Sequence, residues 1–167
     1  MAAGIIDERA DDDANTRLFQ LAHGPLGTRD YHIRMAAVPL GSDRTFMHLN
    51  YSYGFGTAGR IAMQAYLATV GADKVGFTVT GREPNGAPQF IGGVRGAVER
   101  NAMRYYLAID AFLDTMHLPA DQQVERRINA WFSGTERYPR QLREMDRNTY
   151  VTMKRSEYER QQHALGS

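Results

Sequence analysis

The sequence contains no cysteine, which excludes disulfide bonds, thiolate nucleophiles and cysteine-ligated zinc. An excess of one charge is also missing, because 20 basic and 19 acidic residues leave a net charge of +1. Such a balance predicts no nucleic-acid partner. No segment approaches the ~18 apolar residues that a membrane span requires, so none is expected. Hydrophobic residues still make up 43% of the chain, which predicts a soluble globular protein and leaves its compartment open.

With 167 residues, the chain is long enough for one domain with a single core. Its first 15 residues carry five acidic side chains and no apolar stretch of signal-peptide length. Residues 1–17 are therefore predicted to form a disordered acidic leader. A folded domain is predicted over residues 18–118, followed by a helical C-terminal extension over residues 119–167.

Apolar and polar side chains alternate along two neighbouring stretches, Asp30–Val38 and Thr45–Tyr53. A period of two residues predicts half-buried strands. The turn residues Pro39–Asp43 separate them, which predicts an antiparallel hairpin. The short apolar run Leu18–Ala22 and the stretch Val75–Thr80 are predicted to form further strands.

The strongest periodic signal is an apolar stripe along Val94–Met116, whose successive members lie three or four residues apart. This spacing predicts an amphipathic helix of about six turns. Further helices are predicted over Arg60–Val70, over Ala120–Phe132 with Gly134 as its breaker, and over Pro139–His163. The last of these is polar, so it is a candidate for docking a partner or a second copy of the chain, which would make a homo-oligomer.

Gly54, Gly56 and Gly59 form the pattern G-x-G-x-x-G between a predicted strand and a predicted helix. A dinucleotide-binding fingerprint requires this context, because the glycines let the backbone approach a pyrophosphate at the helix N-terminus. These glycines are thus the cofactor site of an alternative interpretation, an NAD(P)-dependent oxidoreductase. A doubly wound fold needs several parallel strands, however, and the predicted hairpin is antiparallel. We favour a hinge between strand and helix, which involves no cofactor.

Antiparallel strands followed by a long amphipathic helix resemble the helix-grip fold of the START-like, or SRPBCC, superfamily, which includes the birch-pollen-allergen-like proteins. The segment Phe90–Ile109 is similar to the last strand, the turn and the gripped helix of bacterial, mostly uncharacterised members. The hairpin Tyr31–Tyr53 is similar to their central strands, and the resemblance covers Leu18–Met116. It implies an α+β fold with an antiparallel sheet packed on the long C-terminal helix and a hydrophobic ligand cavity between them.

The resemblance is incomplete at both ends. A whole helix-grip domain starts with a strand and two short helices, whereas about 17 residues precede the first predicted strand here. The helix Arg60–Val70 and the helical tail are additions to the family's pattern. A partial or open cavity, or one completed by a second chain, is therefore expected. No single chemistry is implied, because the superfamily contains lipid carriers, cyclases and hydrolases.

Candidate ligand-binding residues fall on the hairpin and on the long helix. Tyrosines on both elements suit a pocket wall or ordinary core packing. His32 and His48 lie on the more polar strand face, where they would serve as acid and base only if that face lined a cavity; a solvated face is the favoured alternative. Arg95 and Asn101 suit a ligand carboxylate or a solvated helix face. The candidates are Tyr31, His32, Arg34, His48, Asn50, Tyr51, Tyr53, Arg95, Asn101 and Tyr105.

None of the five histidines has the spacing of a metal motif, and no catalytic residue is assigned. The leading hypothesis is binding of a hydrophobic or amphipathic, lipid-like small molecule between sheet and helix, with no cofactor. The NAD(P)-binding oxidoreductase and a protein-interaction module acting through the C-terminal helices are the alternatives. Whether the protein is an enzyme is left open.

Overall fold

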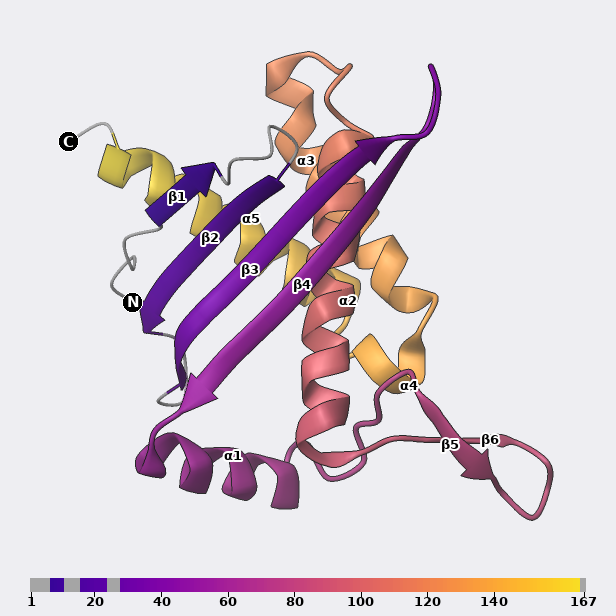
Figure 1. The fold of residues 1–167 in the computed structure, drawn as a ribbon. Coiled ribbons are helices and arrows are strands. Elements are labelled where there is room, and N and C mark those ends of the chain that lie inside the picture. Colours follow the sequence, from indigo (N-terminus) through magenta and orange to yellow (C-terminus); the bar gives the residue numbers. More distant parts are fainter. Residues whose placement is uncertain (1–6, 11–15, 24–27, 166–167) are drawn as a thin grey trace.

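The structure is a computed structural model that describes residues 7–10, 16–23 and 28–165. Four strands form one antiparallel sheet in the order β1-β2-β3-β4 (Figure 1). Their bounds are Asp7–Ala10 for β1, Thr16–His23 for β2, Thr28–Pro39 for β3 and Thr45–Phe55 for β4. The predicted hairpin is confirmed, because β3 and β4 pair antiparallel with Ile33 opposite Tyr51 and Ala36 opposite His48.

Five helices and a second, two-stranded sheet complete the described fold. The helices are α1 (Thr57–Ala68), α2 (Gly93–Leu113), α3 (Ala120–Glu136), α4 (Pro139–Leu142) and α5 (Arg147–Leu165). The small sheet pairs β5 (Val79–Arg82) antiparallel with β6 (Pro88–Phe90). The predicted α+β class is therefore confirmed.

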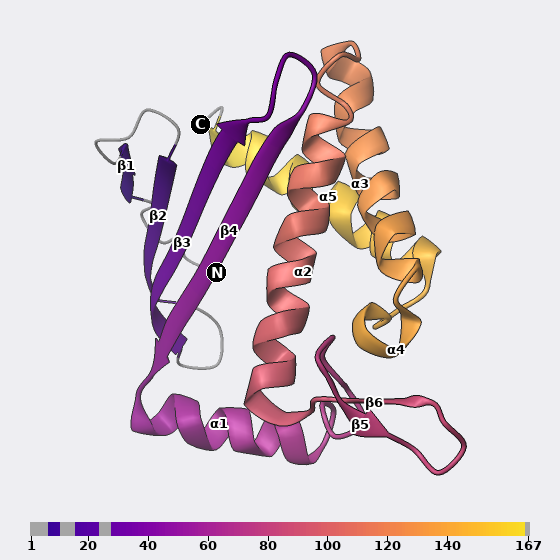
Figure 2. The same cartoon turned by 45° about the vertical axis from the view of Figure 1, so that its right-hand side comes forward.

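The long helix α2 lies between the large sheet and the other helices. Figure 2 shows the sheet on one side of α2 and α3 on the other, with α1 across the end of the hairpin. Contacts with the sheet are made through β4, while α5 packs on α3. The sheet lies beside α2 and, in the described part of the chain, is not wrapped around it.

The two faces of the hairpin differ in burial because its apolar residues alternate. Tyr31 is buried and Ile33 and Tyr51 are half-buried on the face that looks towards α2. His32 and His48 are exposed on the opposite face. One face towards the core and one towards solvent is the usual arrangement of an antiparallel sheet.

The start of α2 packs directly on the backbone of the loop before β5. A Cβ atom at Gly96 would lie 2.9 Å from the carbonyl oxygen of Ile91 and 3.1 Å from the amide nitrogen of Gly76. The amide of Gly76 donates a hydrogen bond of 2.6 Å to that same carbonyl. Glycine at position 96 therefore allows a close approach that any side chain would prevent.

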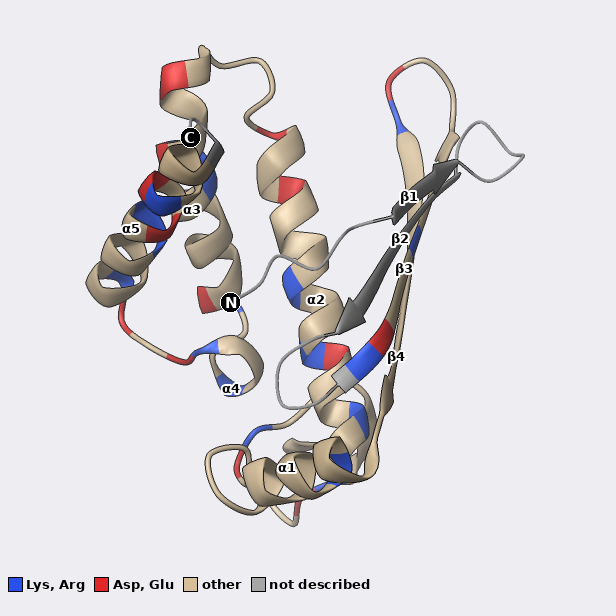
Figure 3. Cartoon of the chain, turned by 90° about the vertical axis from the view of Figure 1, so that its left-hand side faces the viewer, with Lys and Arg blue, Asp and Glu red and all other residues tan. Residues whose placement is uncertain are grey.

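The best-buried apolar side chains lie among the helices. They are Ala97, Leu107 and Ala111 of α2, Phe132 of α3, Leu142 of α4 and Tyr150 of α5. The rings of Phe132 and Tyr150 lie 5.3 Å apart between centroids. Both acidic and basic residues lie along α5 (Figure 3), which agrees with the polar composition expected for the last helix.

Two predicted helix boundaries are wrong. The helix α3 continues through Gly134 to Glu136. Glycine at position 134 lets α3 pack closely on Leu107 of α2, because a Cβ there would lie 2.9 Å from a methyl carbon of Leu107. The predicted Pro139–His163 helix is divided into α4 and α5, since the backbone at Arg143 is extended.

Other differences concern strands. Residues 75–78 are not a strand, because the amides of Phe77 and Thr78 donate to the Glu99 carboxylate of α2 instead of to a neighbouring strand. The strand β1 lies within residues 1–17, for which the sequence predicts a disordered leader; residues 1–6 and 11–15 of that leader are outside the described part. Within the described residues, no helix is both long and apolar enough to cross a membrane.

Candidate functional site

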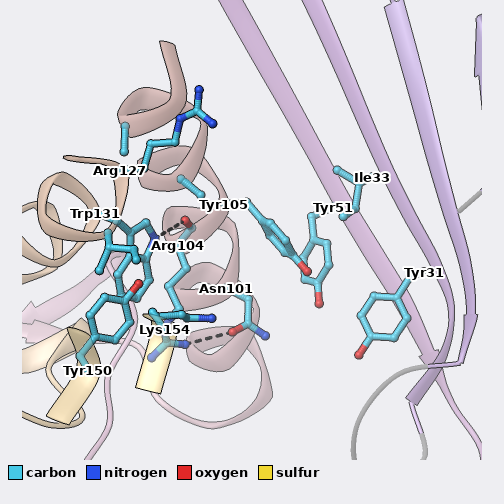
Figure 4. A pocket seen from close by; sticks show the side chains of 13 residues that line it. Tyr31, Ile33, Tyr51, Asn101, Arg104, Tyr105, Arg127, Trp131, Tyr150 and Lys154 are labelled. Atoms are coloured by element: carbon cyan, nitrogen blue, oxygen red, sulfur yellow. Dashed lines mark hydrogen bonds between the residues drawn. The ribbon is translucent and has the colours of Figure 1, made fainter. Parts of the chain in front are cut away.

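A cavity of about 600 Å³ separates the inner face of the hairpin from the helices. Figure 4 shows its tyrosine wall on the sheet side and its tryptophan and basic residues on the helix side. Its walls come from β3, β4, α2, α3 and α5. The lining residues are Tyr31, Ile33, Tyr51, Asn101, Arg104, Tyr105, Ala108, Ala111, Arg127, Ile128, Trp131, Tyr150 and Lys154.

Three neighbouring tyrosines of the hairpin, of which Tyr31 and Tyr51 line the cavity, form the sheet-side tyrosine wall. Tyr53 stacks on Tyr31 with ring centroids 5.3 Å apart, and Tyr51 lies 5.2 Å from Tyr53. Tyr105 of α2 reaches across to Tyr51 at 5.3 Å. Strand alternation places the first three on one face, since they occupy every second position of paired strands. The wall thus offers aromatic faces to an apolar guest.

The phenols of Tyr51, Tyr53 and Tyr105 stay protonated near neutral pH. Burial raises the pKa of Tyr51. Tyr105 and the other neighbouring tyrosines raise this pKa further, whereas a hydrogen bond with Asn101 lowers it. Burial also raises the pKa of Tyr53 and of Tyr105. A protonated phenol can donate a hydrogen bond.

Polar groups converge on the helix side. Arg104 donates to the side-chain oxygen of Asn101 at 3.0 Å and to Glu144 at 2.5 Å. Lys154 donates to Glu157 at 2.7 Å. Two carboxylates outside the lining, Glu144 and Glu157, thus pair with two cations of the cavity.

Trp131 fixes the helix-side wall. Its indole N–H donates to the backbone carbonyl of Arg104 at 3.1 Å, and Tyr150 stacks on its ring with centroids 4.9 Å apart. Because the single hydrogen-bond donor of the indole is satisfied by the backbone, the ring itself acts as an apolar surface. Trp131 is also the one tryptophan in the sequence, which makes it a natural fluorescent reporter.

The structure brings together some of the predicted site residues and not others. Tyr31, Tyr51, Asn101 and Tyr105 line the cavity, and Tyr53 lies against Tyr31. Strand alternation places the remaining four hairpin candidates, on the opposite and exposed face, away from the cavity. These four are His32, Arg34, His48 and Asn50.

Arg95 does not line the cavity either. Its guanidinium pairs with Glu99 at 3.1 Å one turn along α2, and its side chain is exposed. Among the described residues, no group of three His, Asp or Glu side chains is placed to hold a metal ion.

Sequence reasoning missed several lining residues of α2, α3 and α5. Arg104 and Ala108 had a signal, because they lie three and seven residues after Asn101 and so share its helix face. No pattern in the sequence identifies Arg127, Trp131 or Lys154 as lining residues, because only the tertiary packing of separate helices brings them to the cavity.

The glycine motif does not form a dinucleotide-binding unit in the described structure. Gly54 is the second-last residue of β4, Gly56 caps α1 and Gly59 is buried in its first turn. The required β-α-β unit needs parallel strands, but β4 pairs antiparallel with β3 and β5 belongs to the other sheet. The glycines join the strand β4 to the helix α1.

Comparisons with known protein families, with curated proteins and with solved structures found no match to this chain. The START-like resemblance therefore remains a prediction from the sequence.

Proposed function

We propose that the protein binds a hydrophobic or amphipathic small molecule in the cavity between the hairpin and the helices. The single observation that carries this proposal is the cavity of about 600 Å³, walled by both layers of the fold. Small-molecule sites are typically concave spaces of ~300–1,000 Å³, mostly apolar with a few polar groups. This cavity has that size and that mixture of lining residues.

The same proposal includes the finer fold assignment. A sheet beside a long helix, with a ligand between them, is the START-like arrangement that the sequence resembles. Support comes from the contact between Tyr51 of β4 and Tyr105 of α2, two lining residues through which sheet and helix meet at the cavity. The additional wall from α3 and α5 supplies Trp131 and Tyr150. Ligand binding is therefore expected to involve both parts of the chain.

Binding is tested with the neutral fluorescent probe N-phenyl-1-naphthylamine. Excitation of Trp131 is expected to transfer energy to a bound probe, because the indole lines the cavity. Replacing Ala108 by phenylalanine places a ring in the cavity and is expected to weaken binding at least about tenfold, or ~1.4 kcal/mol. A fluorescence titration of each variant measures this change.

Ala130→Phe is the matched control. Ala130 is exposed on α3 and is outside the cavity lining, so the same substitution there should leave affinity within about twofold. Equal affinities of the two variants would contradict the proposal, as would an unchanged Trp131 emission up to the solubility limit of the probe. Circular dichroism verifies that both variants are folded.

A further inference from the structure

The charged residues that line the cavity all carry the same sign. They are Arg104, Arg127 and Lys154, and the described lining contains no aspartate or glutamate. This contrasts with the chain as a whole, in which 20 basic and 19 acidic residues almost balance. Three cations around one partly enclosed space create a positive potential inside it.

Arg127 has the least compensated charge of the three. Its Nε donates to the Thr115 hydroxyl at 2.9 Å and one terminal nitrogen donates to the Gln123 side chain at 2.6 Å. Its guanidinium also lies 4.2 Å from the centre of the Phe112 ring. These partners are neutral, and no described carboxylate lies within ion-pair distance of Arg127. The contacts hold the guanidinium in place while leaving its charge and several of its five N–H donors for a guest.

Arg104 and Lys154 have carboxylate partners that a guest can replace. Glu144 and Glu157 are 48% and 42% exposed, and neither lines the cavity. Solvent screens such exposed pairs, which are worth only ~0–1 kcal/mol each. An anion inside the cavity would meet the same cations in a less solvated place and gain more from them.

The remaining polar groups of the lining are compatible with an anion. The protonated hydroxyl of Tyr51 can donate to an oxyanion, and Asn101 contributes side-chain N–H donors. Aromatic faces of Tyr31, Tyr105 and Trp131 suit the apolar part of a guest. A cationic guest would face three positive charges with no lining carboxylate to balance it.

We propose that the ligand of this cavity is an organic anion, an apolar or aromatic body that carries a carboxylate, sulfonate or phosphate group. This inference rests on the proposed function and specifies its ligand class. The anionic group binds Arg127, the main determinant, and the body lies against the tyrosine wall, while Arg104 and Lys154 add to the positive potential inside the cavity.

The test uses two probes that share one ring system. 1-Anilinonaphthalene-8-sulfonate is anionic, and N-phenyl-1-naphthylamine is the same molecule without the sulfonate. We expect the anionic probe to bind at least about tenfold more tightly, and this advantage should shrink as salt is raised. Fluorescence titrations of the full chain at low and high ionic strength give both affinities.

Variants locate the effect at the cavity. Arg127→Gln is expected to weaken the anionic probe about fivefold to tenfold more than it weakens the neutral probe. Arg126→Gln is the matched control, because Arg126 is the exposed neighbour outside the lining and the net charge changes equally. Lys154→Gln provides the same test if Arg127→Gln does not fold.

Each contrary outcome has a distinct meaning. Absence of binding by both probes would overturn the proposed function and this inference together. Equal affinity for the two probes, or equal effects of Arg127→Gln and Arg126→Gln, would overturn this inference alone. Binding of the anionic probe that Ala108→Phe leaves intact would place the probe outside the cavity, and this inference would then be wrong.

Discussion

Replacing Phe132 by alanine is expected to lower the free energy of unfolding by about 3–5 kcal/mol. Phe132 is only 5% exposed, and its ring contacts Tyr150 with centroids 5.3 Å apart. The guanidinium of Arg147 also lies 4.7 Å from the centre of this ring. Truncation removes these contacts and leaves a cavity between α3 and α5 that helix packing can only partly close. Urea unfolding followed by circular dichroism measures the loss.

Phe46→Ala is the control for this substitution. Phe46 is 54% exposed near the tip of the hairpin, so its truncation is expected to change stability by no more than about 0.5 kcal/mol. Phe132→Ala should also weaken binding of the neutral probe, because Phe132 contacts Tyr150 and Tyr150 lines the cavity. A loss below about 1 kcal/mol would show that α3 and α5 do not pack as described.

Replacing Glu99 by glutamine is expected to lower the free energy of unfolding at pH 7 by on the order of 3 kcal/mol. One carboxylate oxygen accepts from the amides of Phe77 and Thr78 at 2.7 and 2.9 Å. The other accepts from the Thr78 hydroxyl at 2.7 Å and from Arg95 at 3.1 Å. Glutamine has the same size but turns one of these acceptors into a donor, which leaves donors facing donors.

The loss should depend on pH. Burial raises the pKa of Glu99, but the hydrogen bonds from Thr78, Phe77 and Arg95 together lower it by more, to about 2. A lowered pKa stabilises the folded state above about pH 4.5, and this contribution disappears as the pH falls towards 2. The difference between Glu99 and Glu99→Gln proteins should therefore be largest at neutral pH and shrink in acid.

Urea unfolding of both proteins at pH 7 and at pH 3 measures this dependence. Glu136→Gln is the control, because Glu136 pairs with Arg147 at an exposed site and such pairs are worth under about 1 kcal/mol. A difference between Glu99 and Glu99→Gln proteins that is the same at both pH values would show that the charge of Glu99 does not stabilise the fold.

Much of the fold followed from local patterns in the sequence. The alternation along Asp30–Val38 and Thr45–Tyr53 predicted the hairpin, and the stripe along Val94–Met116 predicted α2, because both patterns repeat with the period of the element. Boundaries failed where tertiary contacts outweighed local preference. Gly134 lies inside α3 and packs on Leu107 of α2. In the segment 75–78, the amides of Phe77 and Thr78 donate hydrogen bonds to the side chain of Glu99.

The candidate site was only partly predictable, for a related reason. Tyr31, Tyr51 and Tyr105 were identified because strand alternation and helix periodicity place them on the element faces that line the cavity. The same alternation puts His32 and His48 on the exposed face, in agreement with the favoured alternative for these residues. The basic residues of α3 and α5 could not be found this way, because their approach to the cavity depends on how distant helices pack.

A crystal structure of the protein with 1-anilinonaphthalene-8-sulfonate tests the central claim most directly. The account predicts one probe molecule between the tyrosine wall and Trp131, with its sulfonate within hydrogen-bond distance of Arg127, Arg104 or Lys154. A cavity closed by direct packing of Tyr51 against Trp131, or a probe bound only outside the cavity, would contradict it.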